Sequence, residues 1–531
     1  MSTLALRMAF MSASTSRSAI MKKTIQFGSS TLLSRLLGMV REVLTARYLG
    51  AGVVSDAFFT AFKFPNTLRK MFAEGALTAV FVPAVVSFLR NHGKDHVNSI
   101  MTLAFIIFEG IVLMVCALCM WQAEPLIYFM APGFSAQQLA TAVPMLRILM
   151  PFIFFVSTNA LLSGPLQAIG HIWIPALSPV LLNIVFIAGL VVCTMFGLPA
   201  TWLCWFIVAG GAAQTVLHIT GFLKLNFRFG KITKAARLSF SPVFGRFLLS
   251  MVSAGAVEIG LFIDTQFASY LPAGSVSLIN YANRFMGIPL GVFAVAFSTI
   301  LLPHFSRVGT YAPKRMGYYL LETSKFVLWV TVPVALLMAF FAHNIFETLY
   351  LSDKFTQVHV TKAATILIAY VAGLCFFSLN KVMISMFYAL QSVWIPTVIA
   401  GIGTATNILF NVVLMARMGA AGLALATSLG AILQTILFVI ILRYYFKLPF
   451  YPRAFLQFIT ECIAYLTVLM GLLWLTYKGL YILIERLPAT LSYRLLHTII
   501  FWVWVGPLCL TFFGAWYLVH KKSGMRLHFL E

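Results

Sequence analysis

Charged residues are scarce in this chain, and acidic residues are the scarcest. Only 10% of the 531 residues are Asp, Glu, Lys or Arg, whereas about a quarter of a typical soluble protein is charged. Apolar stretches of about 20 residues recur along the chain, and each is long enough to cross a bilayer as a helix. The sequence therefore predicts an all-α polytopic membrane protein rather than a soluble protein or a β-barrel.

The chain also lacks the motifs of metal-dependent and ATP-driven chemistry. It contains no H-E-x-x-H, no P-loop and no G-x-G-x-x-G after a strand, so nothing supports an ATP-driven pump. Its seven cysteines fall nearly all within apolar stretches, and the C-x-x-C formed by Cys116 and Cys119 has no histidine or second pair nearby. We interpret these cysteines as core or lipid-facing residues rather than as a metal or redox site.

Basic residues outnumber acidic residues by 37 to 14, which gives a formal net charge of +23. In a soluble protein this excess would indicate nucleic-acid binding. Here most of the Lys and Arg residues lie in short loops on alternate sides, as the positive-inside rule requires. We therefore expect no nucleic-acid partner, and we expect both termini to lie in the cytoplasm.

Hydropathy predicts about fourteen membrane spans by the 20-residue criterion. An even number of spans agrees with the loop charges, which place the two termini on the same side. The expected limits are 26–49, 54–88, 100–122, 144–169, 174–197, 200–222, 243–270, 276–304, 320–343, 360–388, 394–416, 420–442, 455–480 and 496–519.

The chain repeats itself at an offset of 222 residues. ARYLGAGVVS at 46–55 and ASYLPAGSVS at 268–277 are identical at seven of ten positions. A few residues further on, at an offset of 221, Lys63 has a counterpart in Arg284. We expect two six-helix lobes related by a pseudo-twofold axis, two additional C-terminal helices, and a central site that opens alternately to each side. The expected divisions are a cytoplasmic extension at 1–23, an N-lobe at 24–237, a C-lobe at 238–447, the last two spans at 448–520 and a cytoplasmic tail at 521–531.

Positive charge dominates the ionisable residues within the predicted spans, and most of it lies in the first hairpin, 34–83. Charges at bilayer depth usually face a water-filled cavity or a partner, although single residues also fit internal ion pairs or snorkelling side chains. Arginine is suited to forked binding of phosphate, so the excess predicts an anionic substrate with a phosphate or pyrophosphate group. Pro65 is expected to kink the second span. The basic candidates are Arg35, Arg41, Arg47, Lys63, Arg69, Lys70, Arg147, Arg284 and Lys381, and the acidic ones are Glu42, Asp56, Glu74, Glu109, Glu258 and Asp264.

A second set of polar residues lies on three later predicted spans. Asp264 falls in 243–270, Asn407 and Asn411 are one turn apart in 394–416, and Thr427 falls in 420–442. Oxygen ligands from three helices suit Na⁺, a hard cation. The same residues also fit a hydrogen-bond cluster between helices, so their spacing leaves both interpretations open.

The first hairpin resembles the MurJ/MviN family. SRLLGMVRE at 34–42, SDAFFTAFKFPNTLRKMFAEGALTAVFVP at 55–83, MAPGF at 130–134 and YANRFMGIPLGV at 281–292 are similar to segments of these bacterial lipid II flippases. The family belongs to the multidrug/oligosaccharidyl-lipid/polysaccharide exporter superfamily. The resemblance implies a two-lobe transporter of the inner membrane that moves lipid II, the undecaprenyl-pyrophosphate-linked peptidoglycan precursor, to the outer leaflet. It also implies that the last two spans form a groove for the polyprenyl tail.

The resemblance further implies functions for individual residues. The family's central-cavity positions match here as Ser34, Arg35, Arg41, Asp56, Arg69, Glu74 and Arg284, and the repeat adds Lys63 as the counterpart of Arg284. The Na⁺ ligands of some members match as Asp264, Asn407, Asn411 and Thr427, with Asn411 in place of an acid. Asn283 and Gly287 stand where many members have acids beside Arg284.

We therefore expect a transporter that makes and breaks no bond, and not an enzyme. It needs no cofactor beyond a coupling Na⁺, acts as a monomer, and has lipid II, membrane lipids and cell-wall synthesis or division proteins as partners. A flippase for another polyprenyl-pyrophosphate-linked oligosaccharide is the near alternative. A cation-coupled drug antiporter is disfavoured by the positive sign of the candidate cavity, and a membrane glycosyltransferase would need a large extracytoplasmic loop that the sequence lacks.

Overall fold

The computed structural model describes residues 17–523, except for the side chains at 17–28, 31, 73–76, 78–79, 252–261, 295–296, 299 and 313. Every regular element in this range is a helix. The helices divide into two compact units, Met1–Gly274 and Ser275–Glu531.

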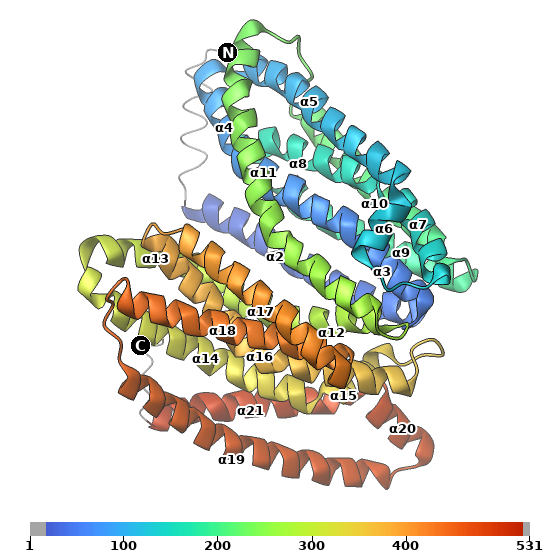
Figure 1. Cartoon of the computed structure of the whole chain (residues 1–531), viewed down its shortest axis with the longest axis vertical. Coiled ribbons are helices and arrows are strands. Elements are labelled where there is room, and N and C mark those ends of the chain that lie inside the picture. Colours follow the sequence, from blue (N-terminus) through green and yellow to red (C-terminus); the bar gives the residue numbers. More distant parts are fainter. Residues whose placement is uncertain (1–16, 524–531) are drawn as a thin grey trace. The chain divides into compact units, whose positions relative to one another are not determined.

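Eleven consecutive helical elements make up the described part of the first unit (Figure 1). They are α2 (Arg17–Leu49), α3 (Val53–Arg69), η1 (Lys70–Leu77), α4 (Thr78–His92), α5 (Lys94–Trp121), α6 (Ala123–Met130), α7 (Ala136–Leu149), α8 (Phe152–Ala168), α9 (Trp173–Met195), α10 (Ala200–Lys224) and α11 (Lys234–Ser269).

Helix α11 packs within the first unit, against η1, α5 and α4. Phe108 of α5 is the centre of this contact, because its ring centroid lies 4.5 Å from that of Phe247 and 5.5 Å from that of Phe240, both on α11. Each aromatic pair contributes about 0.5–1.5 kcal/mol beyond the burial of its area. The duplication assigns this helix to the second half of the chain, whereas packing places it in the unit that ends at Gly274.

The second unit is built around α16, which packs against α18, α14 and α12. Small residues allow its helices to approach closely, because a Cβ at Gly373 of α16 would lie 2.6 Å from Oγ of Ser428 on α18. The elements are α12 (Ser275–Pro289), η2 (Leu290–Val295), α13 (Ala296–Tyr311), η3 (Pro313–Arg315), α14 (Met316–Phe340), α15 (Ala342–Tyr350), α16 (Gln357–Ala389), α17 (Trp394–Met418), α18 (Ala420–Tyr444), α19 (Pro452–Glu485), α20 (Ala489–His497) and α21 (Phe501–Ser523).

A π-helical segment interrupts one long helical run in each unit. In the first unit, α3 continues through Pro65 to Arg69, and the chain then forms η1 before α4. In the second unit, η2 joins α12 to α13 in the same way. Such π-segments change the direction in which the following side chains point and occur often at functional sites.

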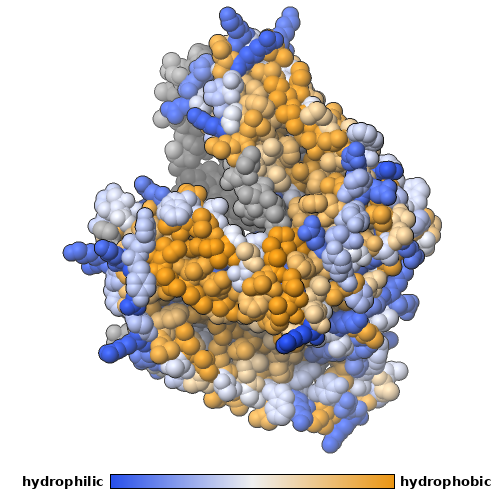
Figure 2. Space-filling view, viewed as in Figure 1, coloured by the Kyte–Doolittle hydropathy of each residue, from blue (hydrophilic) through white to orange (hydrophobic). Residues whose placement is uncertain are grey.

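Ten helices within 17–523 are long and apolar enough to cross a membrane. Every predicted span overlaps a helix or a run of consecutive helices, but 26–49, 54–88, 243–270 and 276–304 are not among these ten. Charged residues or π-segments lie in these four ranges, so the total of about fourteen stays a prediction. Broad apolar areas lie among hydrophilic ones on the visible surface (Figure 2), as expected for helices that face lipid.

Candidate functional site

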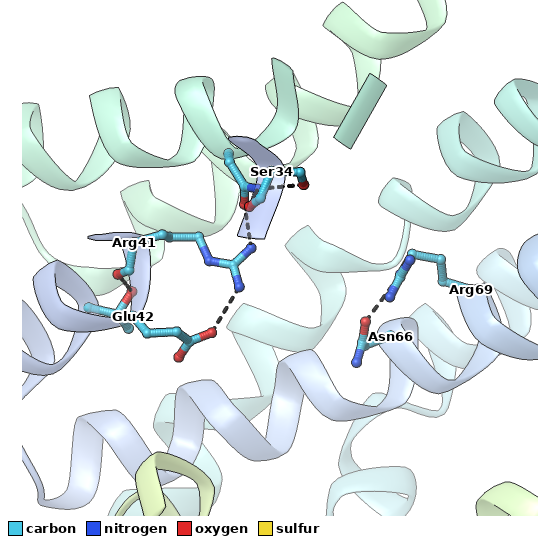
Figure 3. A network of polar contacts seen from close by, with 7 residues as sticks. Ser34, Arg41, Glu42, Asn66 and Arg69 are labelled. Carbon is cyan, nitrogen blue, oxygen red and sulfur yellow. Dashed lines mark hydrogen bonds and ion pairs between the residues drawn. The ribbon is translucent and has the colours of Figure 1, made fainter. Parts of the chain in front are cut away.

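Arg41 is the best-defined member of the candidate site. It lies on α2, and its Nη1 donates a hydrogen bond to Oδ1 of Asn183 over 2.8 Å. Its Nη2 donates to Oε1 of Glu42, also over 2.8 Å (Figure 3). The guanidinium carbon lies 5.1 Å from the ring centroid of Phe186, within the range of a cation–π contact. These three contacts fix the orientation of a guanidinium group whose side chain is 18% exposed.

Asn183 of α9 holds two turns of α2 together. Its Nδ2 donates to the backbone oxygen of Ser34 over 3.0 Å and to the Ser34 hydroxyl over 3.3 Å. Ser34 and Arg41 are seven residues apart, so they lie nearly above one another on the helix. The amide therefore uses its acceptor for Arg41 and its donor for Ser34, and it positions both along the contact between α2 and α9.

The sequence analysis did not identify Asn183 as a site residue. The available signal was an amide within the apolar stretch 174–197, of the kind that forms hydrogen bonds between membrane helices. Its partners are 142 and 149 residues away along the chain. Spacing alone could not reveal them, because no repeat or motif links α9 to α2.

Arg69 is fixed by a neighbour on its own helix. Its Nε donates to Oδ1 of Asn66 over 3.1 Å, within one turn of α3 (Figure 3). This contact uses one of the five N–H donors of the guanidinium group, and the two-pronged end carries the other four. The hydrogen bond from Nε to Asn66 therefore orients the guanidinium group of Arg69.

Lys63 joins α3 to α11. Its Nζ donates to Oγ1 of Thr265, and the neighbouring Phe64 and Phe262 rings lie 6.2 Å apart. Thr265 directly follows Asp264, which is partly buried on the same helix. Packing thus places the basic position of the first hairpin beside the segment that carries the candidate cation ligand.

Asp56 is 1% exposed and stabilises the end of the first unit. Its Oδ2 accepts a hydrogen bond from the backbone nitrogen of Gly274 over 2.6 Å. Gly274 has a φ of +96°, and a Cβ at this position would lie 2.8 Å from the backbone oxygen of Ala51, so this turn requires glycine. The contact identifies a structural role for Asp56, and its predicted role in the cavity stays a prediction.

The remaining candidates are distributed over both units. Arg35 is exposed on α2, and Arg284 is exposed on α12 together with Asn283 and Gly287. Glu74 lies in η1, but its side chain is outside the described residues.

Three of the predicted cation ligands form a hydrogen-bonded cluster in the second unit. Nδ2 of Asn407 donates to Oγ1 of Thr427, and Nδ2 of Asn411 donates to Oδ1 of Asn407, each over 3.0 Å. Asp264 belongs to the first unit. Within the described part of the chain, no three His, Cys, Asp or Glu residues gather to hold a metal ion. The amide and hydroxyl oxygens of the cluster belong to the ligand class that hard cations prefer.

The chain is similar to known proteins over most of its length. Residues 45–486 match the family described as "Lipid II flippase MurJ". The lipid II flippase MurJ of Burkholderia cenocepacia is 34% identical over 454 residues, which cover 83% of this chain and 87% of that protein. The probable lipid II flippase MurJ of Buchnera aphidicola subsp. Schizaphis graminum is 30% identical over 427 residues, or 78% and 81% of the two chains. A solved structure of a lipid II flippase MurJ in an inward closed conformation has the same fold, with a TM-score of 0.76 at 24% identity over 94% of this chain and 100% of that chain.

Proposed function

Because the chain belongs to the lipid II flippase MurJ family, we propose that it moves lipid II from the inner to the outer leaflet of the bacterial cytoplasmic membrane. Lipid II carries the peptidoglycan precursor on an undecaprenyl pyrophosphate, so this step serves cell-wall biogenesis and cell shape. The reaction is transport, with no bond made or broken, and the protein is therefore not an enzyme. The ten membrane-length helices found within residues 17–523 provide the multi-pass framework that such transport needs.

The observation that carries this proposal is the fixed orientation of Arg41. Asn183 and Glu42 each accept one hydrogen bond from its guanidinium group, which has five N–H donors in total. A guanidinium group held in this way loses little side-chain entropy when it binds a phosphate through its other donors. In the proposed mechanism Arg35, Arg41, Arg69 and Arg284 bind the pyrophosphate, and Asp56 and Glu74 pair with these arginines to weaken the grip for release.

Alternating access of two lobes is the proposed route. The two π-segments support it, because η1 begins at Lys70 and η2 begins at Leu290, and this offset of 290 − 70 = 220 also separates Pro83 from Pro303. We take the two π-segments as counterparts in the proposed duplication. We propose about fourteen spans in an N-lobe (24–237) and a C-lobe (238–447), with α19 and α21 (448–520) as the groove for the lipid tail. The termini at 1–23 and 521–531 lie in the cytoplasm, and the transporter works as a monomer beside cell-wall synthesis or division proteins.

A complementation experiment tests the function. The native lipid II flippase of a depletable strain is replaced by this protein, and the lipid II accessible from outside the cell is measured. The unmodified chain should restore export, whereas Arg35→Ala and Arg284→Ala should each reduce it about tenfold, since one charge-assisted hydrogen bond contributes about 1.5–3 kcal/mol. Arg90→Ala, at an exposed position in the last turn of α4, is the control. Normal export by stably inserted Arg35→Ala and Arg284→Ala proteins would rule out the pyrophosphate clamp.

The same experiment separates the alternative substrates. If the chain restores no lipid II export but does export another polyprenyl-pyrophosphate-linked oligosaccharide, the near alternative replaces the proposal. Export of a cationic drug is not expected, because an arginine-rich cavity repels cations.

Na⁺ is proposed as the coupling ion, held by Asp264 with Asn407, Asn411 and Thr427. The amide and hydroxyl oxygens supply hard ligands, and Asp264 supplies the negative charge. We expect Asp264→Ala to abolish any dependence of lipid II export on Na⁺, measured in cells at matched ionic strength with K⁺ in place of Na⁺. An unchanged response to Na⁺ in this variant would contradict the assignment.

A further inference from the structure

Glu109 is a buried carboxyl group that the proposed mechanism does not use. It lies in the middle of α5, a membrane-length helix, and is 2% exposed. Neither of its carboxyl oxygens has a hydrogen-bond partner within the described part of the protein. This is unusual because a buried carboxylate normally has a cation or several donors beside it.

Hydroxyl groups of α8 lie beside this carboxyl. Ser157 and Thr158, which are 1% and 3% exposed, interact with the Glu109 side chain. Their own hydroxyl oxygens also lack a hydrogen bond of good geometry among the described residues. Three buried polar side chains thus meet at the contact between α5 and α8. In this arrangement the two hydroxyl groups do not give a charged carboxylate the hydrogen bonds that it would need.

Aromatic rings next to this cluster connect α5 to α4 and α11. Phe108, the residue before Glu109, packs edge-on against Phe81 of α4, with ring centroids 6.1 Å apart. It also contacts Phe240, Phe244 and Phe247 of α11. The Glu109 side chain itself is 2% exposed, so water has little access to it in this conformation.

The titratable groups around Glu109 supply no positive charge. On its own helix the nearest is the Cys116 thiol, and α8 carries no titratable residue between Phe152 and Ala168. The basic residues of α4 lie in its last turn, and Glu124 of α6 and Arg147 of α7 are exposed. On α11, the basic residues Lys234, Arg237 and Arg246 are exposed, and the side chain of Glu258 is outside the described residues. A carboxylate in these surroundings would be a buried charge without compensation, whereas the neutral acid both donates and accepts hydrogen bonds.

We propose that Glu109 is a proton-binding site of the first unit. In this conformation the carboxyl holds one proton and lies beside the hydroxyl groups of Ser157 and Thr158, which a small side-chain adjustment would bring into hydrogen bonds with the neutral acid. When α5, α8 and α11 separate during the transport cycle, water reaches the site, the O–H bond breaks, and the proton leaves as hydronium while the carboxylate remains. The exchange step rests on the proposed function, but the protonation of Glu109 does not.

Infrared spectroscopy of the purified, lipid-reconstituted protein tests the protonation directly. A neutral carboxyl has a C=O stretching band well above the carboxylate bands, and we expect this band to disappear in Glu109→Gln and to remain in the control Glu124→Gln. Thr158→Val should shift the band without removing it, and this variant preserves the test if Glu109→Gln does not fold. A spectrum that is the same in the wild-type, Glu109→Gln and Thr158→Val proteins would overturn the proposal. The proposal would also be overturned if Na⁺ stabilised the wild-type protein but not Glu109→Gln, because that result would identify Glu109 as part of a cation site.

The exchange step is tested by lipid II export at several external pH values. Glutamine imitates the permanently protonated acid, so Glu109→Gln should lose most of the pH response of the wild-type chain, while Glu124→Gln should keep it. Equal pH responses in the wild-type and Glu109→Gln proteins would overturn the exchange step. If the wild-type chain exports no lipid II, the proposed function fails by itself, and the infrared result still decides the state of Glu109.

Discussion

Replacing Arg41 by alanine is expected to reduce lipid II export about 100-fold. Asn183, Glu42 and Phe186 all contact the guanidinium group of Arg41 and hold it in one orientation. Two charge-assisted hydrogen bonds to a phosphate contribute about 3 kcal/mol or more together, and each 1.4 kcal/mol corresponds to a factor of ten. Export is measured as externally accessible lipid II in the depletable strain, normalised to the amount of inserted protein.

Two matched variants show whether the fork or only the charge matters. Arg41→Lys keeps the charge but loses the planar pair of donors, so we expect about a tenfold reduction, between alanine and wild type. Arg90→Ala is again the control, because Arg90 is exposed in the last turn of α4 and should not affect export. If Arg41→Lys exports as much lipid II as the wild type, a point charge is sufficient and the proposed bidentate binding is wrong.

Asn183→Ala is a weaker version of the same test. The variant removes the hydrogen bonds to Arg41 and Ser34 but leaves the guanidinium charge in place. We expect export to fall by about three- to tenfold, because an arginine that Asn183 no longer orders must lose about 0.5–1.5 kcal/mol of side-chain entropy when it binds the phosphate. Asn183→Asp, which keeps an acceptor for Arg41, should restore part of the loss. An effect of Asn183→Ala on folding alone, seen as reduced insertion with normal export per molecule, would contradict a positioning role.

The helices of this protein could be predicted from sequence because the membrane sets their length. An apolar stretch must be about 20 residues long to cross the hydrocarbon core, and each predicted range overlaps helical residues. The π-segments could not be predicted, because Lys70–Leu77 has no composition that separates it from an α-helix. The wider π-helical turn of η1 depends instead on tertiary packing, here against α4, α8 and α11.

The candidate site was predictable in its charges but not in its contacts. Arg41 and Arg69 stand out because charge is rare in apolar stretches. Asn183, by contrast, is one amide among several in the spans, and only the packing of α9 on α2 shows that it positions Arg41. The position of α11 was equally hidden, since the duplication shows the origin of a helix and not the unit against which it packs.

Replacing Asp56 by alanine is expected to lower stability rather than to act on the substrate alone. Asp56 is buried, and its carboxylate accepts the backbone N–H of Gly274 over 2.6 Å. Removing it leaves this buried donor without its acceptor, which costs about 1–3 kcal/mol, with the charge-assisted bond at the upper end. We expect a lower midpoint of thermal unfolding, measured by intrinsic tryptophan fluorescence of the purified protein, and less inserted protein in the membrane.

Asp56→Asn separates the structural role from a role in the cavity. The amide oxygen can still accept from Gly274, so this variant should regain most of the stability that Asp56→Ala loses. It has no negative charge, however, and cannot compete with a pyrophosphate for the arginines. If the proposed release step is correct, Asp56→Asn folds normally but exports lipid II more slowly. If it matches the wild type in both stability and export, the negative charge of Asp56 is not needed, and its proposed part in release is wrong.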